Sequence, residues 1–281
     1  MPPPKHTHSL HACNTYFDAS NERQNEVESA VTDEKPADRS EAQENAHSDR
    51  PERVLVIVAH PDDADFGAAA TVAKWVSNGT VARLVCCTSG DAGADDARTD
   101  PLELARRRED EQRAAARVVG YEAVDFLHRP DGALENDLAL REQLVRIIRQ
   151  FKPDAVMSMD PTVVIHDRGW IQHVDHRMAA MAAVDAVYPA ARNALAFPNL
   201  VIDEGLEPHT VKDLYMFFTD QPNVWVDVSD TFDTKIAALR EHVSQIRDPE
   251  GFDERLREWS AEAGRKIAVA AAEGFRRVQV G

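Results

Sequence analysis

The sequence predicts an α/β fold in which a mostly parallel sheet is flanked by helices. From residue 51 onward, short apolar runs of strand length alternate with longer segments of helical character. Such alternation is typical of right-handed βαβ units, which assemble into parallel sheets. The first apolar run, residues 54–58, has no polar interruption, as expected for a central strand that is buried on both faces.

Each predicted strand is a short, largely apolar run, and these runs lie at residues 54–58, 81–88, 123–127, 155–159, 214–218 and 224–228. The predicted helices lie at residues 65–77, 101–119, 137–151, 231–246 and 252–274. A further predicted helix passes through His176 and ends at Val187. Gly79 and Gly120 follow two of these helices and mark their ends, because glycine commonly terminates a helix. Pro101 begins the second helix, where the missing N–H group of proline is tolerated. A few extra strands and two helices are therefore expected after the parallel core.

Residues 1–50 differ in composition from the rest of the chain. They carry five basic and ten acidic side chains and show no sustained hydrophobic periodicity. Such a segment buries too little apolar surface to offset the entropy of ordering, so we expect a disordered acidic tail. Residues 51–281 are expected to form one domain.

Charge and cysteine content limit the possible partners and compartments. The net charge of −17 argues against nucleic acids and anionic membranes, because both depend on clustered basic residues. No apolar stretch has the length of a membrane span, and the first 30 residues lack the apolar run of a secretory signal. The cysteines, Cys13, Cys86 and Cys87, are too few for a disulfide framework. A cytoplasmic protein is the expectation.

A first polar cluster, His60-Pro61-Asp62-Asp63, directly follows the predicted strand at residues 54–58. In open α/β sheets, ligands bind outside the carboxyl ends of the strands, so these side chains lie where chemistry is usually done. A single His-Asp pair at this point often only caps a helix. Two adjacent carboxylates exceed what a cap requires, which favours a functional site.

A second polar cluster, His173-Val174-Asp175-His176, lies far along the chain. His173 and His176 are three residues apart and therefore share one face of a helix. Asp175 would fix the tautomer or charge of His173, as carboxylates behind ligating or catalytic histidines commonly do. Taken alone, this cluster could also be a solvated helix start.

Together the two clusters contain the ligands of a hydrolytic zinc site, which takes three protein ligands and keeps one position for water. The ligands would be His60, one of Asp62 and Asp63, and one of His173 and His176. The remaining aspartate would accept a proton from the water that the metal acidifies. The remaining imidazole, if protonated, would stabilise an oxyanion or protonate a leaving amine.

Residues 59–63 and 173–176 resemble the two signatures of the LmbE-like (PIG-L) deacetylase family, an AHPDD motif and a later HPDH-type motif. Further similar runs lie at residues 66–71, 88–93 and 131–132. The resemblance covers about residues 53–250. Two positions depart from the family pattern: Ala64 stands where a glutamate is common, and Val174 replaces the proline of the second motif.

The resemblance implies a Rossmann-like core and a zinc-dependent hydrolase that removes an N-acyl group, usually acetyl, from a small amino-sugar-containing substrate. Carried over by position, it makes His60, Asp63 and His176 the zinc ligands. Asp62 becomes the general base, and His173 stabilises the oxyanion or protonates the amine. Fe²⁺ or another divalent metal would suit the same ligands. The chain would act as a monomer or a homo-oligomer.

The family also places an arginine and an aspartate near sugar hydroxyls or a phosphate, and Arg108 and Asp131 occupy these positions. An internal ion pair of Arg108 with Glu111 or Asp131 is the alternative. Residues 166–168 would line the mouth of the site or form a solvated loop, and His242 would border the pocket or be structural. Two other functions remain open: an amidase of a thiol-sugar conjugate, and a non-catalytic metal- or carbohydrate-binding module.

Overall fold

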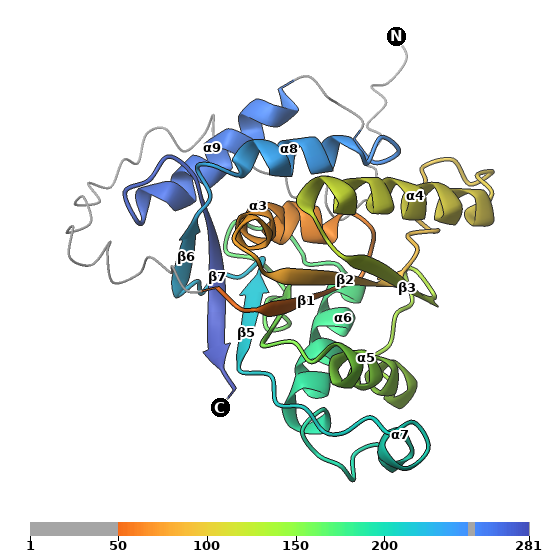
Figure 1. Cartoon of the computed structure of the whole chain (residues 1–281). Helices are drawn as coiled ribbons and strands as arrows, with labels where there is room; N and C mark the ends of the chain where they lie inside the picture. The colour runs from red at the N-terminus through yellow and green to blue at the C-terminus, as the bar shows by residue number, and fades with distance from the viewer. Residues whose placement is uncertain (1–49, 247–250, 281) are drawn as a thin grey trace.

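A seven-stranded sheet forms the centre of the described part of the chain, residues 50–246 and 251–280 of the computed structural model (Figure 1). The strand order is β3-β2-β1-β4-β5-β7-β6. The strands are β1 (Arg53–Val58), β2 (Val81–Thr88), β3 (Ala123–Arg129), β4 (Ala155–Met159), β5 (Asp213–Phe217), β6 (Val224–Asp227) and β7 (Ala272–Gln279). The expected acidic tail, residues 1–50, lies outside the described residues except for Arg50.

Helices cover both faces of the sheet, with α3, α4, α8 and α9 on one side and α5, α6 and α7 on the other (Figure 1). Their bounds are α3 (Asp63–Ser77), α4 (Pro101–Val119), α5 (Leu138–Phe151), α6 (Val174–Asp185), α7 (Pro198–Ile202), α8 (Phe232–Arg240) and α9 (Phe252–Arg265). A short π-helical turn, Ala186–Ala190, continues α6. The predicted α/β class and mostly parallel sheet are confirmed. None of the described helices combines the length and the apolarity needed to span a membrane.

Strand β1 lies at the centre of the parallel part because its side chains are apolar on both faces. Val54 is in register with Ala82 of β2 and with Ala155 of β4, and both pairings are parallel. Residues 54–58 are fully buried. The carboxyl ends of β1, β2, β4 and β5 therefore open at the same edge of the sheet.

Helix α3 packs closely on β5 near this edge because Gly67 has no side chain. A Cβ atom at Gly67 would lie 2.3 Å from the ring of Phe217, a distance that a real side chain does not reach. The close approach places the first turn of α3, which begins at Asp63, beside the end of β5.

The C-terminal region differs from its prediction. We expected a helix over residues 252–274, but α9 ends at Arg265 and Ala272–Gln279 forms the strand β7. The chain folds back over Gly264, where a Cβ atom would lie 2.6 Å from the carbonyl oxygen of Val269. Strand β7 then fills the gap between β5 and β6, antiparallel to both, and this pairing outweighs the helix propensity of the alanine-rich run. The predicted helix over residues 231–246 is also shorter and ends at Arg240.

Candidate metal centre and active site

The first polar cluster lies in a strained turn between β1 and α3. Asp62 has φ 96° and ψ −31°, a conformation that costs energy for a residue with a side chain. Two buried side chains of α4 hold this turn. Gln112 Oε1 accepts the backbone N–H of Asp62 at 2.7 Å, and Arg108 Nη2 donates to the carbonyl oxygen of Pro61 at 2.7 Å.

The second polar cluster begins α6 after a loop that follows β4. His173 is the N-cap residue, and its Nδ1 accepts the backbone N–H of Asp175 at 3.2 Å. The Asp175 carboxylate accepts the backbone N–H groups of Gly132 at 2.7 Å and Leu134 at 3.1 Å. This carboxylate therefore joins the start of α6 to the turn after β3.

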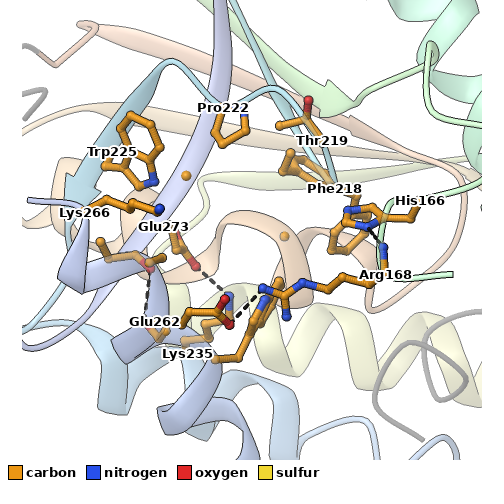
Figure 2. Close-up of a pocket in the computed structure, with 17 residues that line it drawn as sticks. His166, Arg168, Phe218, Thr219, Pro222, Trp225, Lys235, Glu262, Lys266 and Glu273 are labelled. Atoms are coloured by element: carbon orange, nitrogen blue, oxygen red, sulfur yellow. Dashed lines mark hydrogen bonds and ion pairs between the residues drawn. The ribbon is translucent and has the colours of Figure 1, made fainter. Parts of the chain in front are cut away.

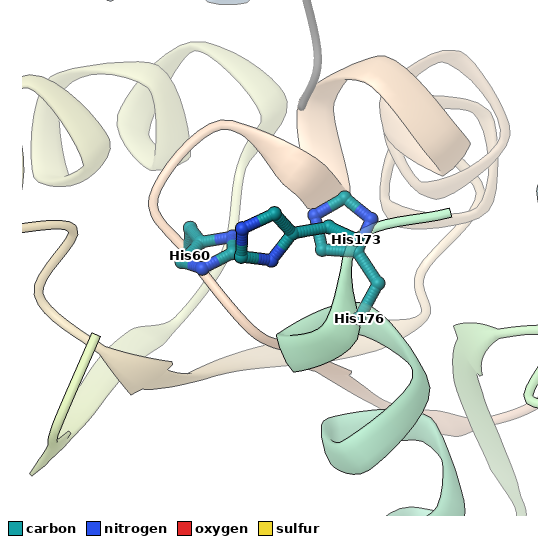
Figure 3. Close-up of side chains that lie close together, drawn as sticks. All are labelled: His60, His173 and His176. Carbon is teal, nitrogen blue, oxygen red and sulfur yellow. The ribbon is translucent and has the colours of Figure 1, made fainter. Parts of the chain in front are cut away.

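The fold brings the imidazoles of both clusters together (Figure 3). The ring centroids of His60 and His173 are 5.0 Å apart, those of His60 and His176 are 5.2 Å apart, and those of His173 and His176 are 5.5 Å apart. One ligating nitrogen from each ring lies within 4.8 Å of the other two. A second group with the same spacing consists of His60, Asp131 and Asp175.

Asp63 lies between His60 and His176. Its Oδ1 is 3.0 Å from His176 Nε2, and its Oδ2 is 3.5 Å from His60 Nδ1. Neither ring nitrogen of the buried His176 has an aligned hydrogen-bond partner within the described residues. A carboxylate oxygen and an imidazole nitrogen that approach closely without hydrogen-bond alignment fit a shared cation, because ligand atoms point at the ion rather than at each other. The residues present therefore fit a divalent metal.

The opposite nitrogen of His60 faces two other carboxylates. Nε2 lies 3.0 Å from Asp131 Oδ1 and 3.3 Å from Asp175 Oδ2. Burial disfavours a charged His60, but the hydrogen bonds to these aspartates and to Asp63 outweigh it and raise the pKa of His60 well above its ordinary value. The carboxylates that favour positive charge on this ring would also attract a cation bound beside it. Because Asp131 and Asp175 contact Nε2, the nitrogen of His60 that faces Asp63 is Nδ1.

Asp62 and Asp63 are neighbours in sequence but differ in electrostatic environment. Burial raises the pKa of Asp62 to about 6, while the charge of Arg108 opposes the rise. Burial also disfavours a charged Asp63, but His176 and His60 outweigh it and hold the pKa of Asp63 well below its ordinary value. The fold therefore favours the anionic form of Asp63, whereas burial favours the protonated form of Asp62 more than is usual for an aspartate.

Arg108 faces this turn. Its side chain is 5% exposed, and its Nη2 lies 3.3 Å from Asp62 Oδ2. Nη1 donates to the carbonyl oxygen of Gly90 at 3.0 Å, where a Cβ atom would lie 2.4 Å from the guanidinium. Within the described residues, the ion pair of Arg108 is thus with Asp62 instead of the Glu111 or Asp131 that the sequence suggested as alternatives.

The structure also places the remaining predicted residues. The Asp131 carboxylate faces His60 and accepts the backbone N–H of Ala92 at 2.7 Å. We expected Asp175 to orient His173, but the Asp175 carboxylate contacts His60, and its backbone N–H reaches His173. His242 is buried and its Nε2 lies 2.8 Å from Asp65 Oδ2.

Sequence reasoning missed the buried network behind Asp62. Gln112 Nε2 donates to Asp65 Oδ2 at 2.8 Å, so Gln112 connects the backbone of Asp62 with the Asp65–His242 pair. The available signal was the position of Gln112 on the same helical face as Arg108. A lone amide on that stripe needs a buried partner in the same way as the guanidinium does.

Comparisons relate this chain to known proteins. The PIG-L family model, described as GlcNAc-PI de-N-acetylase, matches residues 55–187. A diacetylchitobiose deacetylase of Thermococcus kodakarensis is 30% identical over 226 residues, which cover 80% of this chain and 82% of that protein. A mycothiol S-conjugate amidase of Streptomyces coelicolor is 28% identical over 252 residues, covering 71% and 84% of the two chains. The solved N,N'-diacetylchitobiose deacetylase of Pyrococcus horikoshii, complexed with its inhibitor MPG, has a TM-score of 0.74 at 29% identity and covers 92% of each chain.

Proposed function

The chain belongs to the PIG-L family, and from this premise we propose that it is a divalent-metal-dependent hydrolase that removes an N-acetyl group from a small amino-sugar-containing molecule. The observation that carries the proposal is that Asp63 lies against both His60 and His176, whose rings are 5.2 Å apart, while the carboxylate of Asp62 lies near enough to interact with Asp63 and His60. The deacetylases among the relatives support the substrate class.

His60, Asp63 and His176 would hold the metal. Two imidazole nitrogens and one carboxylate oxygen make a three-ligand set, which is typical of hydrolytic zinc sites with an open position. Fe²⁺ accepts the same donor types, so Zn²⁺ and Fe²⁺ are both candidates. When bound, the cation would acidify a water molecule and polarise the acyl carbonyl group.

Asp62 would act as the general base. A carboxyl group with a pKa of about 6 is largely ionised at neutral pH, yet it holds a proton long enough to pass it on. Asp62 would take the proton as the water oxygen attacks the carbonyl carbon. It would return the proton to the nitrogen as the amide C–N bond breaks, which leaves acetate and a free amine.

His173 would stabilise the oxyanion as a neutral hydrogen-bond donor. Burial and the nearby rings of His60 and His176 lower the pKa of His173 to about 4, so the ring is uncharged at neutral pH. Its Nδ1 accepts the backbone N–H of Asp175, which places the ring proton on Nε2. This arrangement favours hydrogen bonding to the oxyanion over protonation of the leaving amine.

An amidase of a thiol-sugar conjugate is the second candidate. The 28% identity to the mycothiol S-conjugate amidase favours it, and such a reaction would use the same groups on a different acyl chain. A non-catalytic binding module is less well supported, since a purely structural metal site requires neither Asp62 nor His173.

The proposal is tested by metal-depleted protein reloaded with Zn²⁺ or Fe²⁺ and incubated with a panel of N-acetylated amino sugars and thiol-sugar conjugates. We expect acetate release from at least one amino sugar, with one metal ion per chain. Cleavage of the conjugates alone would favour the amidase. One bound metal per chain with no product from any compound would contradict both hydrolase proposals and favour the binding module.

A further inference from the structure

The backbone of Asp62 has a conformation that an aspartate rarely adopts without help. Its φ of 96° lies in the left-handed region, which favours glycine, and its ψ is −31°. Such strain persists only where the surrounding contacts hold it. Rotation about these two angles would move the carboxylate of Asp62. The contacts that hold this backbone therefore also determine where the proposed general base points.

The N–H side of this residue is held by Gln112, a fully buried side chain of α4. Gln112 Oε1 accepts the backbone N–H of Asp62 at 2.7 Å. On the other side, the carbonyl oxygen of Asp62 accepts the N–H groups of Asp65 at 2.9 Å and Phe66 at 3.0 Å, where α3 begins. Loss of the Gln112 acceptor would leave a buried N–H without this partner, at a cost similar in size to the backbone strain. The strained conformation would then lose its advantage over a relaxed one.

The amide of Gln112 is fixed in one orientation by its two neighbours. Its Nε2 donates to Asp65 Oδ2 at 2.8 Å. A backbone N–H only donates and a carboxylate only accepts, so a flipped amide would lose both hydrogen bonds. His242 Nε2 lies 2.8 Å from the same oxygen of Asp65, and both side chains are buried. Three segments that are far apart in the chain, namely α3, α4 and the residues after α8, thus fix one acceptor at the N–H of Asp62.

Gln112 differs in this respect from Arg108, which lies one helical turn earlier on α4. Arg108 Nη2 lies 3.3 Å from the Asp62 carboxylate and so contacts the proposed base itself. Within the described residues, the hydrogen bonds of Gln112 go to the backbone of Asp62 and to the carboxylate of Asp65. An effect of Gln112 on the reaction would therefore pass through the position of Asp62.

We infer that Gln112 is a positioning residue, which holds the strained backbone of Asp62 so that its carboxylate faces the attacking water molecule. The inference rests on the proposed function and adds a residue that acts on the base and not on the metal. Asp63 is held separately, because its Oδ2 accepts the backbone N–H of His60 at 2.8 Å. Loss of Gln112 should therefore lower kcat and leave the metal in place.

The test compares the metal-loaded wild type with Gln112→Met, whose side chain has a similar length but neither accepts nor donates in this network. We expect kcat to fall by about 10²-fold, as for a catalytic group that is displaced by about 1 Å. KM and the metal content per chain should stay within about twofold, because substrate and metal binding do not depend on the base. Acetate release and elemental analysis measure these quantities. A kcat within about twofold of the wild type, or loss of the metal, would overturn the inference.

Glu273→Gln is the matched control for a purely structural effect. Glu273 is buried and accepts a backbone N–H of α3, that of Thr71 at 2.8 Å, but it lies on β7 and pairs with Lys235 in the wall of a cavity (Figure 2). Both variants should lower the melting temperature, because each loses a buried polar contact. Only Gln112→Met should lower kcat, measured at a temperature below both melting temperatures. An equal loss of kcat in the two variants would contradict a positioning role.

Reversal of the hydrogen bond between Gln112 and Asp65 gives a second test. Gln112→Glu alone places two carboxylates against each other, so kcat should fall. In the double variant Gln112→Glu with Asp65→Asn, the new amide donates to the new carboxylate, whose second oxygen still accepts the N–H of Asp62. The net charge is unchanged, and kcat should recover by about tenfold relative to Gln112→Glu. No recovery in a folded double variant would contradict the proposed network.

Failure of the proposed function gives a different result, namely no acetate from the wild type with any substrate. Crystal structures of the metal-loaded wild type and of Gln112→Met then still decide the inference. A changed φ at Asp62 together with a carboxylate displaced by about 1 Å or more supports it. An unchanged Asp62 in the variant contradicts it.

Discussion

The parallel and antiparallel parts of the sheet bring polar groups to the same edge in different ways. In the parallel part, β1 ends two residues before His60, and the carboxyl ends of its neighbours β2 and β4 lie at the same edge. Candidate ligands therefore lie within a few residues of the ends of strands. At the antiparallel end, β7 runs in the opposite direction, and its first residues, Ala272 to Gly274, line a cavity together with residues of α9. The comparison suggests that the parallel part determines the chemistry, whereas the antiparallel end mainly contributes to stability through buried contacts such as the Lys235–Glu273 ion pair.

Removal of a metal ligand from the parallel part should have the largest effect. In His176→Ala, we expect bound metal to fall from one ion per chain to almost none, and hydrolysis to fall below detection. His209→Gln is the matched control, because His209 donates to the Pro153 carbonyl oxygen at 2.7 Å, away from the centre. Elemental analysis together with acetate release checks this. Full metal occupancy in His176→Ala would remove this residue from the ligand set.

The next largest effect should come from Asp62→Asn, which keeps the shape of the side chain but removes its basicity. We expect kcat to fall by about 10²–10⁴-fold, the usual contribution of a general base, while one metal ion stays bound. The same change at Asp63 should instead release metal. Loss of metal in Asp62→Asn would mean that the two neighbouring carboxylates have the reverse roles.

At the antiparallel end, the expected effect is on stability rather than on chemistry. Lys235 and Glu273 form a buried ion pair with side chains that are 2% and 6% exposed. Lys235→Ala leaves a buried carboxylate without its partner and should lower the free energy of unfolding by about 3–5 kcal/mol. Arg257→Ala breaks the solvent-exposed pair with Asp233 and should cost at most about 1 kcal/mol. Chemical denaturation measures the free energy of unfolding of both variants. An equal loss in Lys235→Ala and Arg257→Ala would contradict the burial of the Lys235–Glu273 pair.

The smallest expected effect is a pH dependence of stability behind the active-site turn. Burial disfavours a charged His242, but its hydrogen bond to Asp65 outweighs burial and raises the pKa of His242 above 6.5. A raised histidine pKa stabilises the fold below pH 6.5, and this contribution is lost as pH rises through the folded-state pKa. The melting temperature of the wild type should therefore exceed that of His242→Gln by more at pH ~6 than at pH ~9. A difference in melting temperature that is the same at both pH values would exclude a contribution of His242 to the pH dependence of stability.

The parallel part of the fold could be predicted from sequence because its signals are local. The apolar run of β1, the His60 that follows it, and the close spacing of His173 and His176 at the start of α6 each occupy a few consecutive residues. The difference in electrostatic environment between Asp62 and Asp63 could not be predicted from the residues alone. It depends on the burial of Asp62 and on the contact of Asp63 with His176, which lies far along the chain and meets the turn only in the folded protein.

The antiparallel end was predicted less well because its structure depends on tertiary contacts. The run after Gly264 has the alanine content of a helix, but it pairs with β5 and β6 as β7. The cavity at this end is lined by residues from distant parts of the described domain, such as Gly67 and Lys266. No spacing within the sequence indicates that these residues share a surface.

Anomalous diffraction from crystals of the zinc-loaded protein tests the central claim most directly. The account predicts a single zinc peak about 2.0–2.2 Å from one nitrogen each of His60 and His176 and from a carboxylate oxygen of Asp63. The Asp62 carboxylate should lie beside this ion without binding it. A peak held instead by Asp131 and Asp175, or no peak between the two histidines, would contradict the assignment of the site.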